Sequence, residues 1–96
     1  MSRAKKLFCV VAYDIADDRR RLRVVKILEK YGVRANFSVF ECMFTESQFL
    51  KVQQSLKERM KEREDTIVYY TICVNCYTKI VYQPARKKDV KTVDFF

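Results

Sequence analysis

The chain has 96 residues, 49% of them hydrophobic, with one Gly and one Pro, a composition that predicts a single regular domain and argues against disorder. Its 20 Lys and Arg against 12 Asp and Glu leave a formal charge of +8, which favours a polyanionic partner, above all nucleic acid. No apolar run approaches the roughly 18 residues of a membrane span, and residues 1–6 do not resemble a signal peptide, so we expect a cytoplasmic protein without a membrane partner.

The first predicted element is a strand that ends at Asp14. Residues 7–13 are apolar in both alternating phases, which is typical of a strand covered on both faces. Asp14 then lies at the carboxyl end of a central strand, where α/β proteins commonly bind ligands. An aspartate in this position can also be a turn or cap residue, but Asp17 and Asp18 already suit the N-cap of the next helix. Asp14 is therefore a candidate functional residue.

The second predicted element is a helix over residues 17–31, ended by Gly32 in a position where a left-handed backbone is usual. At about 100° per residue, one broad face is apolar and the other is cationic. The apolar face holds Val24, Val25, Ile27, Leu28 and Tyr31, and the cationic face holds Arg19, Arg23, Lys26 and Lys30. Arg21 lies in the first turn at a core-facing position, so its side chain should lean toward Asp14. There it could bind a phosphate or form a simple ion pair with an aspartate.

The third predicted element is one continuous alternating strand over residues 33–44. One face carries Val33, Ala35, Phe37, Val39 and Met43, and the other carries Arg34, Asn36, Ser38, Phe40, Cys42 and Phe44. The second face therefore begins polar and ends aromatic.

A second helix and two more strands are predicted beyond this strand. Thr45 and Gln48 fit a capping box, with Thr45 as N-cap and Gln48 reaching back to it. The helical stripe that follows holds Phe49, Val52, Leu56 and Met60. Residues 66–74 are rich in β-branched and aromatic side chains, and residues 79–83 repeat that character after a turn at 75–78, so both segments are predicted strands.

The predicted order is β-α-β followed by α-β-β, or β-α-β-β-α-β if the 33–44 segment is split. The simplest architecture is a ferredoxin-like α+β sandwich over residues 1–96, an antiparallel sheet with both helices on one face. The opposite face would be bare, although the first strand is apolar in both phases and the second ends in Phe40, Cys42 and Phe44. A symmetric second copy is the economical cover for such a face, so we expect a homodimer.

The residue types limit the chemistry. The chain has no His, so any catalysis must use carboxylates, hydroxyls, thiols or cations. The four cysteines are expected to be reduced thiols rather than disulfides. A four-thiolate zinc site would need Cys9 and Cys42 to approach Cys73 and Cys76, but both lie in apolar strand patterns where a small buried thiol is usual.

Two-fold symmetry could bring two copies of Asp14 together. One carboxylate is a poor metal site, whereas two carboxylates with waters and a substrate phosphate can hold Mg²⁺ or Mn²⁺. A dimer would therefore have a chemical consequence as well as a structural one.

Several motifs together resemble one protein family. They are Tyr13-Asp14-Ile15 at the end of the first strand, the arginine-rich start of the helix at residues 17–24, Tyr31-Gly32 at its end, and Ser38-Val39-Phe40-Glu41-Cys42 in the second strand. With the chain length, Thr45-Glu46 and the Cys73-x-x-Cys76 segment, they resemble the second core Cas protein, the small CRISPR-associated adaptation protein, over essentially the whole chain.

The resemblance implies a ferredoxin-like homodimer in antiviral defence that binds DNA or RNA, bridges dimers of the CRISPR integrase and helps to insert captured DNA into the CRISPR array. It also implies a metal-dependent endonuclease, with Mg²⁺ or Mn²⁺, acting on single-stranded RNA or duplex DNA. Carried over by position, the catalytic residues are Asp14, which would also bind the metal, Tyr13, Arg21 and Arg34. Residues at the dimer contact or beside the site are Phe40 and Ser38.

The basic residues of the first helix and the C-terminal tail are the expected binding segments. The expected nucleic-acid-binding residues are Arg19, Arg20, Arg23, Lys26 and Lys30. Arg23 matches a position that the family links to its active centre, but it lies on the cationic helix face, so we expect it to bind phosphate. In the C-terminal tail, residues 83–96, the segment 90–96 resembles an extra strand that docks on a second copy or on the integrase.

Two other functions stay open. A purely non-catalytic adaptor would bind DNA and the integrase through the basic residues and the tail, without needing Asp14. A stand-alone ribonuclease toxin of the same fold would need the metal centre but no integrase, and an integrase gene beside a CRISPR array would exclude it.

Overall fold

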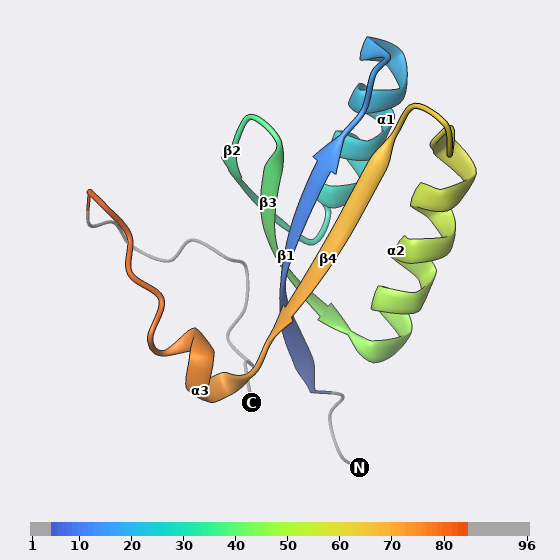
Figure 1. The fold of residues 1–96 in the computed structure, drawn as a ribbon. Coiled ribbons are helices and arrows are strands. Elements are labelled where there is room, and N and C mark those ends of the chain that lie inside the picture. Colours follow the sequence, from blue (N-terminus) through green and yellow to red (C-terminus); the bar gives the residue numbers. More distant parts are fainter. Residues whose placement is uncertain (1–4, 85–96) are drawn as a thin grey trace.

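The computed structural model describes residues 5–84, which form a β-α-β-β-α-β unit and one further short helix (Figure 1). The elements are β1 (Lys6–Asp14), α1 (Asp18–Leu28), β2 (Gly32–Asn36), β3 (Val39–Thr45), α2 (Glu46–Arg59), β4 (Thr66–Ile72) and α3 (Val74–Tyr77). The four strands form an antiparallel sheet in the order β2-β3-β1-β4, and α1 and α2 lie on one face of it. The predicted ferredoxin-like α+β sandwich is confirmed. None of the helices in this part of the chain is long and apolar enough to cross a membrane.

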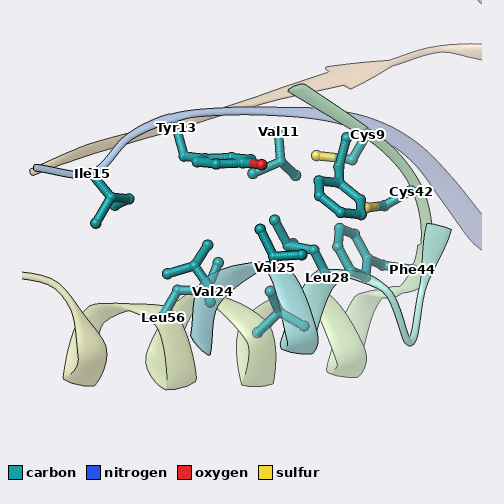
Figure 2. Close-up of a cluster of buried hydrophobic side chains, with 12 residues drawn as sticks. Cys9, Val11, Tyr13, Ile15, Val24, Val25, Leu28, Cys42, Phe44 and Leu56 are labelled. Carbon is teal, nitrogen blue, oxygen red and sulfur yellow. The ribbon is translucent and has the colours of Figure 1, made fainter. Parts of the chain in front are cut away.

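The main core lies between the sheet and the two long helices, as Figure 2 shows. β1 contributes alternate side chains because successive residues of a strand point to opposite faces. The buried members are Cys9, Val11, Tyr13 and Ile15 from β1 and its end, Val24, Val25 and Leu28 from α1, Phe40, Cys42 and Phe44 from β3, and Val52 and Leu56 from α2. The predicted apolar faces of both helices are confirmed.

Both long helices begin at the predicted caps. The Asp17 carboxylate accepts the backbone N–H of Arg20 at 3.0 Å. Thr45 Oγ1 accepts the N–H of Gln48 at 3.2 Å, and Gln48 Oε1 accepts the N–H of Thr45 at 2.8 Å, which completes the capping box. These bonds satisfy donors that the first helical turn leaves open.

Residues 33–44 form a hairpin, and the prediction of one continuous strand there is wrong. β2 ends at Asn36, and β3 begins at Val39. Asn36 Oδ1 accepts the N–H of Ser38 at 3.0 Å, and the strand register shifts between Arg34 and Asn36. An asparagine that bonds to its own backbone two residues on initiates a turn. The split order, which the sequence had left open, is therefore the correct one.

Gly32 was predicted to end the first helix with a left-handed backbone, and this prediction is wrong. The residue begins β2, and its φ is not positive. α1 itself ends at Leu28, three residues before the predicted end at Tyr31. A Cβ on Gly32 would overlap the backbone carbonyl oxygen of Glu41 and lie 2.7 Å from the Cα of Cys42. Glycine is required here because the backbones of β2 and β3 approach closely.

The helix-free face of the sheet was predicted to be bare, and this prediction is wrong, because the chain after β4 covers part of that face. Phe8 and Met43 are buried there, with the partly buried side chains of Val10, Ile72, Tyr77 and Ile80 packed against them. Beside this cluster, the Tyr82 hydroxyl donates to the Glu41 carboxylate at 2.9 Å. The aromatic end of β3, which was expected to need a partner copy, instead packs under the two helices.

The predicted strand over residues 79–83 is also wrong. These residues follow α3 and pair with no strand in the described part of the chain. Within this segment Ile80 packs onto the sheet face, beside Tyr77 of α3, whose ring lies 4.8 Å from that of Phe8, whereas Val81 is 79% exposed. The predicted tail strand over residues 90–96 lies outside the described residues.

Candidate functional site

Asp14 ends β1 and pairs with Thr66 of the outer strand β4. Its side chain is exposed, and among residues 5–84 its carboxylate has no ion-pair or hydrogen-bond partner. It lines a hollow of about 110 Å³, whose other walls are Tyr13, Ile15, Arg21, Phe37 and Ser38. Because Asp17 serves as the N-cap of α1, the Asp14 side chain is not needed as a cap and makes no structural contact in the described part of the chain. The predicted position of this carboxylate at the end of a central strand is confirmed.

Tyr13 points away from the solvent, into the core (Figure 2). Its hydroxyl donates to the carbonyl oxygen of Phe37 at 3.1 Å, and its backbone N–H donates to the carbonyl oxygen of Ser38 at 3.0 Å. Both bonds hold the turn between β2 and β3 against the end of β1. Tyr13, predicted as catalytic, and Ser38, predicted at the dimer contact or beside the site, therefore fix the shape of the site through the turn.

Arg21 leans toward the end of β1, as predicted, but its ion-pair partner is Asp18 and not Asp14. One guanidinium nitrogen, Nη2, donates to the carbonyl oxygen of Ile15 at 3.0 Å, and Nη1 contacts the Asp18 carboxylate at 2.6 Å. The side chain of Asp18 is 91% exposed. An exposed pair of this kind contributes only about 0–1 kcal/mol, so Arg21 can exchange Asp18 for a phosphate at little cost.

Arg34 and Phe40 lie on the other side of the turn. Phe40 is fully buried, and the exposed guanidinium of Arg34 sits 5.7 Å from the centre of its ring, a cation–π contact. Phe40 thus lies beneath the site, and its buried ring offers no surface to a second copy. Arg34 lines a second hollow of about 220 Å³, whose other walls are Asp18, Arg21, Leu22, Val25 and Phe37. The two hollows share Arg21 and Phe37.

Four of the five predicted nucleic-acid-binding residues form an exposed basic stripe along and just after α1. The basic stripe consists of Arg19, Arg23, Lys26 and Lys30. Arg20 differs, because its side chain is only 14% exposed and its guanidinium contacts Asp65 at 2.8 Å and Glu64 at 3.1 Å. Arg20 is therefore committed to an ion pair within the chain rather than presented to a ligand.

Asp65 is an important residue that no sequence pattern indicated. Its side chain is fully buried and accepts the backbone N–H of Ala16 at 3.0 Å and that of Lys61 at 2.8 Å, in addition to the Arg20 guanidinium. The Arg20 guanidinium, assisted by these N–H groups, holds the pKa of Asp65 well below its usual range. The carboxylate ties the loop after Asp14 to the turn before β4. Asp65 lies in the charged run at residues 57–65, and because such runs are ordinary on protein surfaces, nothing in the sequence indicated that this carboxylate is buried.

The four cysteines do not converge. Cys9 and Cys42 are cross-strand neighbours in the core, and burial raises the pKa of each thiol to about 12. Cys73 and Cys76 are exposed at α3, where Cys73 Sγ accepts the backbone N–H of Cys76 at 3.4 Å. The prediction of a buried thiol pair on the strands is confirmed, and the reduced state of the four cysteines stays a prediction. No group of three or more His, Cys, Asp and Glu that could hold a metal ion occurs between residues 5 and 84.

We expect an alkylating reagent to distinguish the two cysteine pairs. Iodoacetamide should modify Cys73 first in the native protein, because it is exposed and because the N–H and thiol groups of Cys76 lower the pKa of Cys73. Cys9 and Cys42 should react only after guanidinium unfolding. Peptide mass spectrometry of native and unfolded samples measures both rates, and equal modification of all four thiols in the native protein would contradict the buried pair.

Known proteins resemble this chain over most of its length. Residues 7–80 match the family model described as CRISPR associated protein Cas2. The chain is 39% identical over 71 residues to a CRISPR-associated endoribonuclease Cas2 of Synechocystis, which covers 74% of this chain and 77% of that protein. It is 38% identical over 66 residues to the CRISPR-associated endoribonuclease Cas2 of Thermus thermophilus, which covers 69% of this chain and 70% of that protein.

Solved structures share the fold. The crystal structure of Streptococcus pyogenes Cas2 at pH 6.5 superposes with a TM-score of 0.69 at 28% identity, over 76% of this chain and 94% of that one. A chain of a partial Cas6-RT-Cas1–Cas2 complex superposes with a TM-score of 0.65 at 25% identity. The match covers 75% of this chain and 84% of that one. The matched family model, the identity to curated relatives and the common fold show that the chain belongs to the Cas2 family of CRISPR-associated proteins.

Proposed function

We propose that this Cas2 protein acts in CRISPR adaptation as a homodimer that binds nucleic acid and a Cas1 integrase, and that Asp14 makes it a metal-dependent endonuclease. The observation that carries the proposal is the exposed Asp14 carboxylate, which has no partner among residues 5–84 and faces a hollow lined by Arg21. The names of the curated relatives support the endoribonuclease activity, and the Cas1–Cas2 complex among the structural neighbours supports the integrase partner.

Asp14 fits a hard divalent cation as one oxygen ligand, and Mg²⁺ or Mn²⁺ is the proposed metal. One chain supplies a single carboxylate to this hollow, because Asp17 caps α1 and Asp18 does not line it. A second Asp14 from a symmetric copy, waters and the substrate phosphate would complete the ligand set, which joins the metal proposal to the homodimer. Such a cation would supply an activated water and neutralise charge on the phosphate.

The protein's own residues would bind and orient the substrate. Arg21 would turn from the exposed Asp18 to a phosphate oxygen, and its bond to the carbonyl oxygen of Ile15 would keep it at the hollow. Arg34, held over the ring of Phe40, would stabilise charge on the same phosphate or its neighbour.

The outer strand of the sheet supports the homodimer. On the helix-free face of β4, Val68 and Tyr70 are 37% and 55% exposed, while the neighbouring Phe8 is fully buried. β4 is also the edge strand on its side of the sheet. An edge strand with exposed apolar side chains is a favourable place for a second copy to pair.

A non-catalytic adaptor is the second candidate function. It is favoured by the single carboxylate at the hollow and by the absence of a group of three or more possible metal ligands in the part of the chain that the structure describes. Such an adaptor would use the basic stripe for DNA and would not need Asp14.

Both candidate functions require the basic stripe to bind nucleic acid. We expect the triple variant Arg19→Glu, Lys26→Glu, Lys30→Glu to bind duplex DNA more weakly, because each side chain is exposed and free to contact a phosphate. Each lost contact should lower the slope of log affinity against log salt by about one unit. Fluorescence anisotropy titrations between 50 and 300 mM salt, about the range over which such slopes are resolved, measure both quantities.

A matched control separates the stripe from net charge. The variant Lys51→Glu, Lys57→Glu, Lys79→Glu changes the charge equally at exposed positions away from α1 and should retain most of the affinity and slope. Equal losses in both variants would show that only the total charge matters. Unchanged affinity in the stripe variant would remove these residues from the interface.

A further inference from the structure

Phe37 is an exposed aromatic side chain at the tip of the β2–β3 hairpin. It is 78% exposed, and Leu22 of α1, which lines the same hollow, is 54% exposed. Single exposed apolar residues are normal and need no explanation. Two exposed apolar side chains around one hollow, with two arginines at its rim, form a more specific arrangement.

The backbone holds Phe37 in this position. Its carbonyl oxygen accepts the Tyr13 hydroxyl at 3.1 Å, and the following residue, Ser38, is bonded on both sides. Ser38 donates its N–H to Asn36 Oδ1 at 3.0 Å, and its carbonyl oxygen accepts the N–H of Tyr13 at 3.0 Å. A ring on a turn fixed in this way loses little backbone entropy when a ligand binds.

The hollow beside Phe37 has the dimensions and chemistry for one planar ring. Its volume of about 220 Å³ is below the roughly 300–1,000 Å³ of pockets for drug-sized ligands. Leu22 and Val25 provide apolar surface, while Arg21 and Arg34 provide cations. An aromatic face beside cationic groups is the combination with which proteins bind single-stranded nucleic acid, the base stacking on the ring and the phosphate contacting the cation.

The position of the hollow links it to the proposed site. Phe37 and Arg21 line both this hollow and the smaller one that contains Asp14. A base stacked on Phe37 would therefore bring its own phosphate to Arg21, beside the Asp14 carboxylate. A base within a duplex is stacked on both faces and cannot enter, so the site would select unpaired nucleotides.

We propose that Phe37 and the hollow lined by Leu22, Arg21 and Arg34 form a stacking site for one unpaired nucleobase, which gives the protein a preference for single-stranded over duplex nucleic acid. This inference rests on the proposed function, since it requires that the protein bind nucleic acid. Phe37 thereby acts as a specificity-determining residue.

The test compares single-stranded and duplex oligonucleotides of the same sequence, with and without an internal 2-aminopurine. Phe37→Ala should weaken single-strand binding about 5- to 100-fold, as expected for the loss of one base–aromatic stack, and leave duplex binding within about twofold. Phe37→Trp should retain single-strand binding and the quenching of 2-aminopurine fluorescence, which reports stacking. Val81→Ala is the matched control, because Val81 is 79% exposed but lines neither hollow.

The outcomes separate this inference from the function on which it rests. If the wild type binds neither oligonucleotide, the proposed function fails. If the wild type binds and Phe37→Ala binds the single strand equally well, the stacking site is wrong while the proposed function stands. If Phe37→Ala changes the oligomeric state in light scattering, the ring contacts a second copy and the stacking site is also overturned.

Discussion

Replacement of Asp14 by Asn is expected to lower the rate of metal-dependent cleavage about 100-fold or more, because a neutral amide is a much poorer ligand than a carboxylate for a hard cation. The fold should be unaffected, since the Asp14 side chain is exposed and has no partner among residues 5–84. Single-turnover cleavage of labelled single-stranded RNA and of duplex DNA, with Mg²⁺, Mn²⁺ or EDTA, measures the effect.

Asp18→Asn is the matched control for Asp14→Asn. It removes a nearby carboxylate in the first turn of α1 and frees Arg21 from its ion pair, but it leaves the proposed metal ligand in place. Cleavage should persist in this variant. Loss of activity in both variants would point to local charge rather than to ligation, and loss of the dimer in Asp14→Asn alone would make Asp14 a structural residue.

If neither the wild type nor Asp14→Asn cleaves, and both bind DNA equally, the adaptor becomes the better description. The basic stripe would then carry the function, and Asp14 would have no role in the isolated protein. DNA-binding affinity measured beside cleavage distinguishes this result from a misfolded preparation.

Local sequence patterns predicted the features that depend on neighbours in the chain. The capping box at Thr45 and Gln48 and the cap at Asp17 are formed by residues three positions apart, so they can be read directly. The helical periodicity of α1 and α2 likewise identified the sides that meet the core. The position of Asp14 followed from the length of the apolar run before it.

Features that depend on close packing between strands could not be predicted from the sequence. The hairpin turn at Asn36 contains neither Gly nor Pro, and the alternation of the two strands continues through it, so the pattern resembled one strand. Gly32 follows a helical apolar pattern, which suggested the end of a helix. Glycine is required there for another reason, because the backbone of Glu41, nine residues later, leaves no room for a Cβ. Residues 79–83 have strand-like composition, but Ile80 and the preceding Tyr77 pack against Phe8 and Met43 on the face of the sheet, so the segment does not extend the edge of the sheet.

The pair formed by Arg20 and Asp65 is the clearest case, because its members lie 45 residues apart. Arg20 stands in a run of arginines and was grouped with the exposed cations. Only the fold shows that one member of the run turns inward while its neighbours Arg19 and Arg21 remain at the surface or at the hollow.

Replacement of Asp65 by Asn is expected to lower the free energy of unfolding by about 3 kcal/mol at neutral pH, the size typical of a broken buried ion pair. The buried carboxylate accepts from Arg20, Ala16 and Lys61 through its two oxygens, and the amide of Asn would turn one acceptor into a donor facing donors. Urea unfolding of the two proteins measures the difference. Glu64→Gln is the control, since its side chain is 53% exposed and its loss should change stability by no more than about 0.5 kcal/mol.

The pH dependence of the same experiment tests whether charge is the cause. Because the folded protein lowers the pKa of Asp65, the carboxylate stabilises the fold fully above its ordinary pKa of about 3.9, and this contribution is lost as the pH falls below about 5 toward the folded value. The wild type should therefore lose stability on acidification faster than Asp65→Asn, and the gap between them should narrow at about pH 3. A gap of equal size at pH 7 and pH 3 would assign the loss to packing, and the loop beside Asp14 would then be held by shape rather than by the buried charge.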